Sequence, residues 1–220
     1  MTQQNETKLE KISDFFIARL NTYEKHMLEI CGKEAYQKFA DLVPANTNRI
    51  LDLGCGTGLE LDEIFKRLPN ISVVGIDLTG PMLDILKQKH ADKNIKLVCD
   101  NYFNVDLGEN IFDAVISFQA MHHYLHDEKI GLYKKIQKAL TSKGVYIESD
   151  YMLIDQSVED ELYAESARLR QNVNLPQGEV YHVDTPCTIN NQISMLKQSG
   201  FSSANLRYKM GNMAAIFAKK

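Results

Sequence analysis

Short apolar segments alternate with longer amphipathic segments between Arg49 and Glu148, and this alternation restricts the possible folds more than any other feature of the chain. Apolar and β-branched residues favour strands at 50–53, 72–76, 95–98, 112–117 and 145–148. Helices are expected at 59–68, 81–90 and 127–140, and a turn is expected at 142–144. Strands that alternate with helices of this length indicate a parallel sheet built from right-handed βαβ units.

The segments on either side do not continue the alternation. Before it, an apolar period of 3.6 residues predicts a helix over 8–30, and a second helix is expected over 33–42, ahead of Pro44. After it, we expect a helix over 156–173, a loop over 174–188 and a helix over 189–199. Strands at 201–208 and 212–218 flank Lys209-Met210-Gly211, which predicts a closing hairpin.

The charge balance and the cysteine spacing make several classes of protein improbable. The 220 residues include 25 basic and 29 acidic side chains, giving a net charge of -4, so the basic surface of a nucleic-acid-binding protein is not expected. The four cysteines are far apart and form no CxxC pair, which suits a reducing compartment. No apolar run reaches the roughly 18–20 residues that cross a bilayer, and no signal peptide is recognisable. We therefore expect a cytoplasmic protein that binds neither nucleic acid nor membrane.

The most informative motif is a glycine-rich turn, Asp52-Leu53-Gly54-Cys55-Gly56-Thr57-Gly58, which follows the first expected strand and begins a helix. Glycines let the backbone approach a ligand closely and adopt positive φ, and the free N–H groups of a helix N-terminus favour negative charge nearby. The GxGxG spacing differs from the GxGxxG of dinucleotide-binding proteins, and the Lys-Ser/Thr pair of a P-loop is missing. The motif predicts a ligand-binding loop of another class.

Two acidic residues follow the next two expected strands. Asp77 lies 23 positions after Gly54, and an acid at about this distance accepts hydrogen bonds from ribose hydroxyls. Asp100 is placed to accept a hydrogen bond from an adenine amino group. Each also has a purely structural interpretation, Asp77 as a helix cap and Asp100 as a cap or turn residue. The glycine loop and Asp77 together indicate a nucleoside-containing ligand at the carboxyl ends of the strands.

These motifs resemble, in order, those of the class I S-adenosylmethionine (SAM)-dependent methyltransferases. The glycine loop is similar to their first motif, Val74-Gly75-Ile76-Asp77 to the second, and Cys99-Asp100-Asn101 to the segment that carries an adenine-contacting acid. Residues 112–117 resemble the fourth-strand motif, and 140–145 the turn into the fifth strand. The resemblance covers about 49–150. It implies an α/β fold with a Rossmann-like sheet of seven strands, mostly parallel with an antiparallel last strand, and helices on both faces.

The resemblance also implies four segments with different roles within a single methyltransferase domain. Residues 1–45 would form an N-terminal helical cover, 46–150 the cofactor-binding core, 151–188 a helical cap insertion beside the substrate, and 189–220 the C-terminal helix and closing hairpin. SAM is the implied cofactor and S-adenosylhomocysteine (SAH) its product, with Asp77 at the ribose and Leu78 and Met82 beside the adenine. The residues expected to contact it are Tyr23, Asp52, Gly54, Cys55, Gly56, Gly58, Asp77, Leu78, Met82, Asp100, Asn101, Phe118 and Met121.

The residues that would handle the substrate lie after the fourth strand and in the two helical additions. His122 is a candidate general base, since histidine titrates near neutral pH, and it fits a pocket-lining role equally well. Tyr23 is the second catalytic candidate, at the methyl end of the cofactor, or else it packs in the apolar stripe of its helix. His122 and His126 have the spacing of a helical metal pair, but spacing alone supplies no further ligand, so no metal is predicted. Further substrate contacts are expected from Arg19, His26, His123, Tyr151, Arg170 and His182.

The expected activity is methyl transfer from SAM to a small-molecule acceptor by in-line displacement, with positioning and water exclusion as the main catalytic terms. A monomer or homodimer is expected. One alternative is a catalytically silent cofactor-binding partner module. Another is an RNA or protein methyltransferase, although Ser117-Phe118-Gln119-Ala120 stands where enzymes that methylate amino groups of bases or glutamine have Asn/Asp-Pro-Pro-Tyr/Phe. The early third glycine opposes a nicotinamide dehydrogenase.

Overall fold

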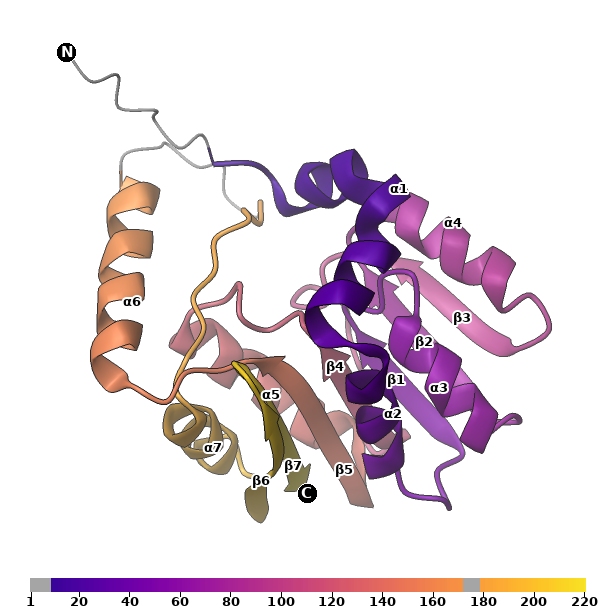
Figure 1. Cartoon of the computed structure of the whole chain (residues 1–220). Helices are drawn as coiled ribbons and strands as arrows, with labels where there is room; N and C mark the ends of the chain where they lie inside the picture. Colours follow the sequence, from indigo (N-terminus) through magenta and orange to yellow (C-terminus); the bar gives the residue numbers. More distant parts are fainter. Residues whose placement is uncertain (1–8, 172–178) are drawn as a thin grey trace.

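Strands and helices alternate through most of the part of the chain that the computed structural model describes, residues 9–171 and 179–220 (Figure 1). The strands are β1 (Arg49–Leu53), β2 (Ser72–Asp77), β3 (Asn94–Cys99), β4 (Phe112–Phe118), β5 (Leu140–Tyr151), β6 (Ser203–Met210) and β7 (Met213–Lys219). The helices are α1 (Ile12–Cys31), α2 (Lys33–Leu42), α3 (Leu59–Arg67), α4 (Gly80–Lys89), α5 (His126–Ala139), α6 (Gln156–Gln171) and α7 (Ile189–Gln198). The last two residues of the helix expected over 156–173, and the first five of the loop expected over 174–188, lie outside the described residues.

The strands form one seven-stranded sheet in the order β3-β2-β1-β4-β5-β7-β6. The pairs among β1 to β5 are parallel, while β7 is antiparallel to both β5 and β6. β7 therefore runs against all the other strands, because β6 returns to the common direction. This arrangement confirms the expected seven-stranded Rossmann-like sheet with an antiparallel last strand.

Helices cover both faces of the sheet, because successive strand residues point to opposite sides. Ile50 belongs to the core under α2, α3 and α4, whereas its neighbour Leu51 belongs to the core under α5 and α7. Both side chains are 1% exposed or less, as expected for a strand that is buried on both faces. The central strands are therefore held on two sides, and their carboxyl ends form one fixed edge.

The C-terminal half differs from the sequence-based expectations at two boundaries. The turn expected at 142–144 is instead part of β5: the pairing with β4 shifts from Phe112↔Leu140 to Ala114↔Val145, so the additional residues form a bulge within the strand. The hairpin turn lies at Gly211-Asn212 rather than 209–211, because β6 continues to Met210, which pairs with Met213. Both corrections lengthen strands at the expense of turns.

The first helix also begins later than its apolar pattern indicates. α1 starts at Ile12, because the residues just before it pair with the segment that follows the α6 region. Lys11 forms an antiparallel bridge with Tyr181, and the His182 N–H donates to the Glu10 carbonyl at 2.9 Å. This pairing joins the start of α1 to residues 180–182, so two distant segments meet above the carboxyl edge of the sheet.

Candidate cofactor and acceptor site

The glycine loop turns the chain sharply from β1 into α3. Gly54, Gly56 and Gly58 all have positive φ, at 76°, 46° and 73°. The Gly54 N–H donates to the carbonyl of Ile76 in β2 at 2.8 Å, and the Gly58 N–H donates to the carbonyl of Cys55 at 2.8 Å. Gly58 has a left-handed conformation and forms the N-cap of α3. Glycine is favoured at each position because a Cβ atom makes this conformation strained.

The three glycines differ in what a side chain would meet. A Cβ on Gly54 would lie 2.5 Å from the Cβ of Ala120, and one on Gly58 would lie 2.4 Å from Leu86 Cδ1. A Cβ on Gly56 would meet no atom closer than the Tyr23 hydroxyl, at 3.6 Å, and Met82 Sδ, at 3.7 Å. Gly54 and Gly58 therefore permit close packing of the protein, whereas Gly56 borders open space.

Asp77 faces this space from the end of β2. Its two carboxylate oxygens accept hydrogen bonds from the backbone N–H groups of Gly56, at 2.9 Å, and Thr79, at 2.8 Å. Burial raises the pKa of Asp77, although both N–H groups oppose this effect by stabilising the charged form. Each oxygen keeps a further lone pair, so the fixed carboxylate can also accept hydrogen bonds from a ligand.

Two acids are buried directly behind the glycine loop. Asp52 is completely buried, and neither of its oxygens has a hydrogen-bond partner in the described residues. Burial raises the pKa of Asp52 strongly, and the neighbouring Glu60 adds to this effect; burial also raises the pKa of Glu60 to about 7. A buried carboxyl group without a partner favours its neutral, protonated form, which is the physical cause of both shifts. The loop and the Asp77 carboxylate, which face the space beside Gly56, thus fit a nucleoside such as SAM.

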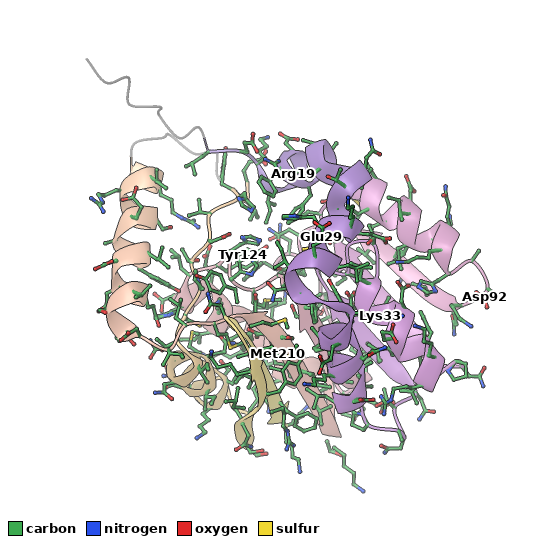
Figure 2. All side chains as sticks on the ribbon, viewed as in Figure 1. Arg19, Glu29, Lys33, Asp92, Tyr124 and Met210 are labelled. Carbon is green, nitrogen blue, oxygen red and sulfur yellow. The ribbon has the colours of Figure 1, made fainter. Side chains whose placement is uncertain are left out.

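Two cavities meet beside the loop. The smaller one is bordered by Gly54, Gly56, Asp77, Leu78 and Met82. The larger one, of about 1100 Å³, lies between α1, the loop after β4, residues 182–184 and the turn between β6 and β7. Figure 2 shows Arg19 and Glu29 on α1 and Met210 at the end of β6, all of which line it. The side chains that border both cavities are Phe16, Tyr23, Gln119 and His123.

Tyr23 stands at the junction of these cavities. Burial raises the pKa of its phenol, with a further contribution from the acids Glu60 and Asp77. The phenol therefore stays protonated near neutral pH and can donate a hydrogen bond. Phe16, two turns earlier in α1, contacts the Tyr23 ring edge-on at 5.8 Å between ring centroids.

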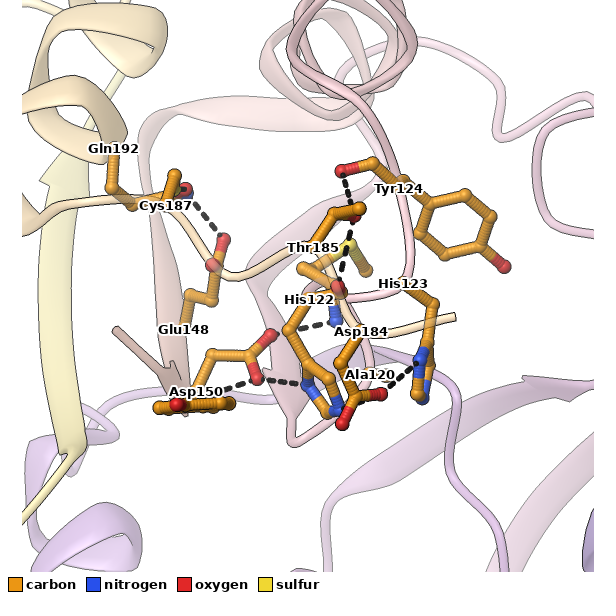
Figure 3. Close-up of polar contacts among 12 residues, drawn as sticks. Ala120, His122, His123, Tyr124, Glu148, Asp150, Asp184, Thr185, Cys187 and Gln192 are labelled. Atoms are coloured by element: carbon orange, nitrogen blue, oxygen red, sulfur yellow. Dashed lines mark hydrogen bonds and ion pairs between the residues drawn. The ribbon is translucent and has the colours of Figure 1, made fainter. Parts of the chain in front are cut away.

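His122 is held by an acid at the end of β5. Its Nδ1 lies 2.5 Å from Asp150 Oδ1, and Asp150 also accepts hydrogen bonds from the N–H groups of Met121 and Tyr151, each at 2.7 Å (Figure 3). Burial by itself disfavours the imidazolium, but the Asp150 carboxylate outweighs it and raises the pKa of His122. In return, His122 lowers the pKa of Asp150 against the effect of burial. The pair fixes the ring so that Nε2 faces away from Asp150.

A second acid, Asp184, lies among three histidines. Its Oδ1 is 3.2 Å from His123 Nδ1 and 3.7 Å from His122 Nε2 (Figure 3). The same oxygen is 3.9 Å from His182 Nε2. Burial lowers the pKa of His123 to about 4, whereas the histidines lower the pKa of Asp184 to about 2 despite its own partial burial. The His182 ring stacks on Phe15 of α1 at 3.5 Å between centroids.

Only some of the other expected site residues border a cavity. Arg19, His26 and Tyr151 line the larger cavity, and Leu78 and Met82 the smaller one. The remaining expected contacts border neither cavity: Asp52, Cys55, Gly58, Asp100, Asn101, Phe118, Met121 and Arg170.

Local contacts account for several of these placements. Phe118 stacks on Tyr36 of α2 at 4.4 Å between centroids, and Met121 is fully buried in the opposite core. The Asp100 carboxylate accepts a hydrogen bond from the N–H of Asn101, and the Arg170 Nε donates to Ser166 within α6. These four side chains thus have partners within the protein.

Two acids of the site, Asp150 and Asp184, were not assigned from the sequence. Asp150 is the next-to-last residue of β5, close to the carboxyl edge of the sheet where Asp77 ends β2, so this position was the available signal. Asp184 lies in a segment without periodicity, and the structure brings it to the site because Thr185 donates to the His122 carbonyl through both its N–H and its hydroxyl. His126, which has helical spacing from His122, instead lies 2.8 Å from Glu159.

This geometry defines a class of protein: a seven-stranded α/β protein with a glycine loop facing an acid at the carboxyl edge of the sheet and a wide cavity beside them. Comparisons with known proteins agree. Residues 50–144 match a family model described as a methyltransferase domain. A carboxy-S-adenosyl-L-methionine synthase of Helicobacter hepaticus is 28% identical over 182 residues, covering 78% of this chain and 75% of that protein.

Solved structures share the fold at low sequence identity. A proposed O-methyltransferase of Nostoc punctiforme aligns with a TM-score of 0.72 and 22% identity, over 97% of this chain and 63% of the other. Human N-acetylserotonin methyltransferase, solved in complex with SAM, aligns with a TM-score of 0.70 and 16% identity, over 96% of this chain and 59% of the other. The chain thus spans less than two thirds of either solved protein.

The methyltransferase-domain match over residues 50–144 and the shared fold support a class I SAM-dependent methyltransferase with SAM as its cofactor. None of the helices in residues 9–171 and 179–220 combines the length and the apolar character needed to cross a membrane. All four cysteines are free thiols.

Proposed function

We propose that the chain transfers the methyl group of SAM to a small-molecule acceptor that enters the larger cavity. The observation that carries this proposal is the junction of the two cavities at Phe16, Tyr23, Gln119 and His123. A ligand held by Gly56 and Asp77 would present its reactive end there, and an acceptor in the larger cavity would approach from the other side. The acidic net charge of -4 agrees with a small acceptor rather than RNA.

The cofactor supplies an electrophilic methyl group, so the chain mainly has to align the acceptor and exclude water. Alignment of two bound reactants contributes up to about 7–11 kcal/mol to lowering a barrier. Phe15, Phe16 and Tyr151 give the larger cavity aromatic walls suited to a planar acceptor. Tyr23 lines both cavities, and its protonated phenol can donate a hydrogen bond to a ligand at the junction.

An acceptor that arrives with an O–H group must also lose a proton. Among the described residues that line the cavity, His122 is the histidine fixed by a buried carboxylate, Asp150, and its Nε2 is available to a ligand. This arrangement favours an acceptor hydroxyl whose proton is removed with the help of His122. We therefore propose O-methylation of a small aromatic hydroxyl compound as the reaction class.

Calorimetric titration with SAM, SAH and NAD tests the cofactor part. We expect SAM and SAH to bind and NAD not to bind. Asp77→Asn should weaken SAM binding at least tenfold, whereas Asp92→Asn, which alters an exposed acid paired with Lys93, serves as the matched control. Binding of NAD alone would refute the proposal.

Formation of SAH in the presence of a panel of phenols, catechols and aliphatic alcohols tests the acceptor part. Turnover with a hydroxyl compound, reduced at least 100-fold by His122→Gln, is the expected result. SAM binding without turnover of any acceptor would favour a silent module. The mass of the nucleoside that copurifies with the protein would show whether the chain instead resembles its H. hepaticus relative in producing carboxy-SAM.

A further inference from the structure

Three potential metal ligands meet at the wall of the larger cavity. His122, His123 and Asp184 each offer one ligand atom, and these atoms lie within 4.8 Å of one another. Asp184 Oδ1 is 3.2 Å from His123 Nδ1 and 3.7 Å from His122 Nε2. Two ligands of a tetrahedral zinc ion lie roughly 3.4 Å apart when each bond is about 2.1 Å long. The spacing is therefore close to that of a formed metal site.

An unsatisfied nitrogen provides independent support. His123 is 3% exposed, and its buried Nδ1 faces Asp184 Oδ1 at 3.2 Å without the geometry of a hydrogen bond. Buried polar atoms nearly always have a hydrogen bond, so this ring nitrogen beside a carboxylate calls for a better-placed partner. A cation bound between the three side chains would supply it.

The outer contacts of His122 match those of a metal-bound histidine. Metal-binding histidines commonly donate their second ring N–H to a carboxylate, which fixes both the tautomer and the ring orientation. Asp150 lies 2.5 Å from His122 Nδ1, is itself held by two backbone N–H groups, and leaves Nε2 directed toward Asp184 (Figure 3). The fixed orientation would reduce the entropic cost of binding an ion.

We propose that His122, His123 and Asp184 bind one divalent transition-metal ion of the zinc type. Two imidazoles and one carboxylate suit Zn²⁺, Mn²⁺, Fe²⁺ or Co²⁺ better than Mg²⁺ or Ca²⁺, which prefer oxygen ligands. Three protein ligands leave a coordination position open, as in catalytic zinc sites. Because all three residues line the larger cavity, this open position is available to a molecule within it.

The ion would have a defined role at the acceptor, and this role rests on the proposed function. An acceptor hydroxyl at the open position would become more acidic, because a bound cation stabilises the oxyanion, and its proton would pass to water in the cavity. His122 then serves as a ligand, and the ion takes over the task of promoting proton loss. His123, which borders both cavities, places the bound oxygen near the junction with the cofactor site.

Titration of the chelator-treated full-length protein with Co²⁺ tests the site without reference to methyl transfer. We expect one equivalent to bind, with visible absorption bands typical of four- or five-coordinate Co²⁺ and loss of these bands on addition of Zn²⁺. His123→Gln and Asp184→Asn should each weaken binding at least tenfold. Asp150→Asn should weaken it about 10–100-fold through His122. His90→Gln, which alters a histidine paired with Asp62 on another part of the surface, should leave binding unchanged.

Two results would overturn the metal proposal. The first is that the wild-type protein binds no Co²⁺ or Zn²⁺ at 100 micromolar ion. The second is that the Asp184→Asn and His123→Gln variants are folded, as judged by circular dichroism, and still bind the ion as the wild type does. If a variant does not fold, X-ray absorption of zinc-loaded wild-type protein decides instead, since it must show two imidazole ligands. Calorimetry with SAM on the same samples separates this failure from failure of the proposed function.

Discussion

Substitution of Gly54 tests whether the glycine loop is packed as the structure shows. In Gly54→Ala the new Cβ would lie 2.5 Å from the Cβ of Ala120 at a backbone φ of 76°. The unfavourable φ contributes about 1–2 kcal/mol of destabilisation. Overpacking adds about 1–3 kcal/mol, because neither atom belongs to a flexible side-chain end. We therefore expect a total loss of about 2–5 kcal/mol in the free energy of unfolding.

A matched control separates these two contributions. Gly211 also has positive φ, at 59°, but an added Cβ would meet no atom within 4 Å. Gly211→Ala should therefore show only the conformational cost, about 1–2 kcal/mol. In a double-mutant cycle, Ala120→Gly should recover about 1–3 kcal/mol in the Gly54→Ala background, which is the overpacking contribution.

Urea unfolding of the four proteins of the cycle and of Gly211→Ala, followed by circular dichroism, provides the measurement. For a chain of this length, each kcal/mol also corresponds to a shift of about 2–4 °C in Tm. Close packing at Gly54 is refuted if Gly54→Ala lowers the free energy of unfolding by no more than Gly211→Ala does. It is also refuted if the coupling energy between positions 54 and 120 is below about 0.5 kcal/mol.

Three further substitutions have defined outcomes. Burial raises the pKa of Glu60 to about 7 from 4.5, so the folded protein retains a proton that the unfolded chain releases. The free energy of unfolding should therefore fall as the pH rises through this window, by up to about 3 kcal/mol. Urea unfolding at pH 5 and pH 8 should show a smaller fall in Glu60→Gln than in the wild-type protein. Phe118→Ala should lower the unfolding free energy by about 3–5 kcal/mol, because the ring stacks on Tyr36 in the core, while calorimetry of the folded variant should show SAM binding within threefold of wild type. Thr188→Ala removes the side chain that accepts the Asn191 N–H at the start of α7 and should cost about 1 kcal/mol in the same unfolding assay; a change below 0.3 kcal/mol would contradict the capping role.

The sheet could be predicted from sequence because its signals are local. A strand buried on both faces is continuously apolar, as in Ile50 and Leu51, and the glycine loop marks the transition into α3. The bulge at 142–144 was missed for a physical reason: Ser142, Lys143 and Gly144 are typical turn residues, but Leu140 and Val145 on either side of them both pair with β4 and keep them within β5. Tertiary pairing outweighed local preference there.

The contacts among the residues of the larger cavity were harder to predict from the sequence, because these residues are distant from one another in the chain. Asp184 lies 62 positions after His122, in a segment without helix or strand periodicity. Its position depends on hydrogen bonds from Thr185 to the His122 carbonyl and from His182 to the Glu10 carbonyl, which spacing alone does not reveal. Residue types in the sequence did identify His122, His123 and His182, but not the acid that brings them together.

The two cavities are built in different ways, and this has a consequence for how such a chain can change. The smaller cavity joins one continuous stretch, residues 54–82, which is braced by its own backbone hydrogen bonds, to residues from 12–23, 102 and 119–124. The wall of the larger cavity combines residues from 15–31, 119–123, 182–184 and 210–213. Because Phe16 and Tyr23 of α1 line both cavities, exchange of α1 together with 179–184, which are paired with each other, would reshape the larger cavity and its junction with the smaller one in a single step. The glycine loop and Asp77 would keep their places in such an exchange, because they belong to the sheet and its turns.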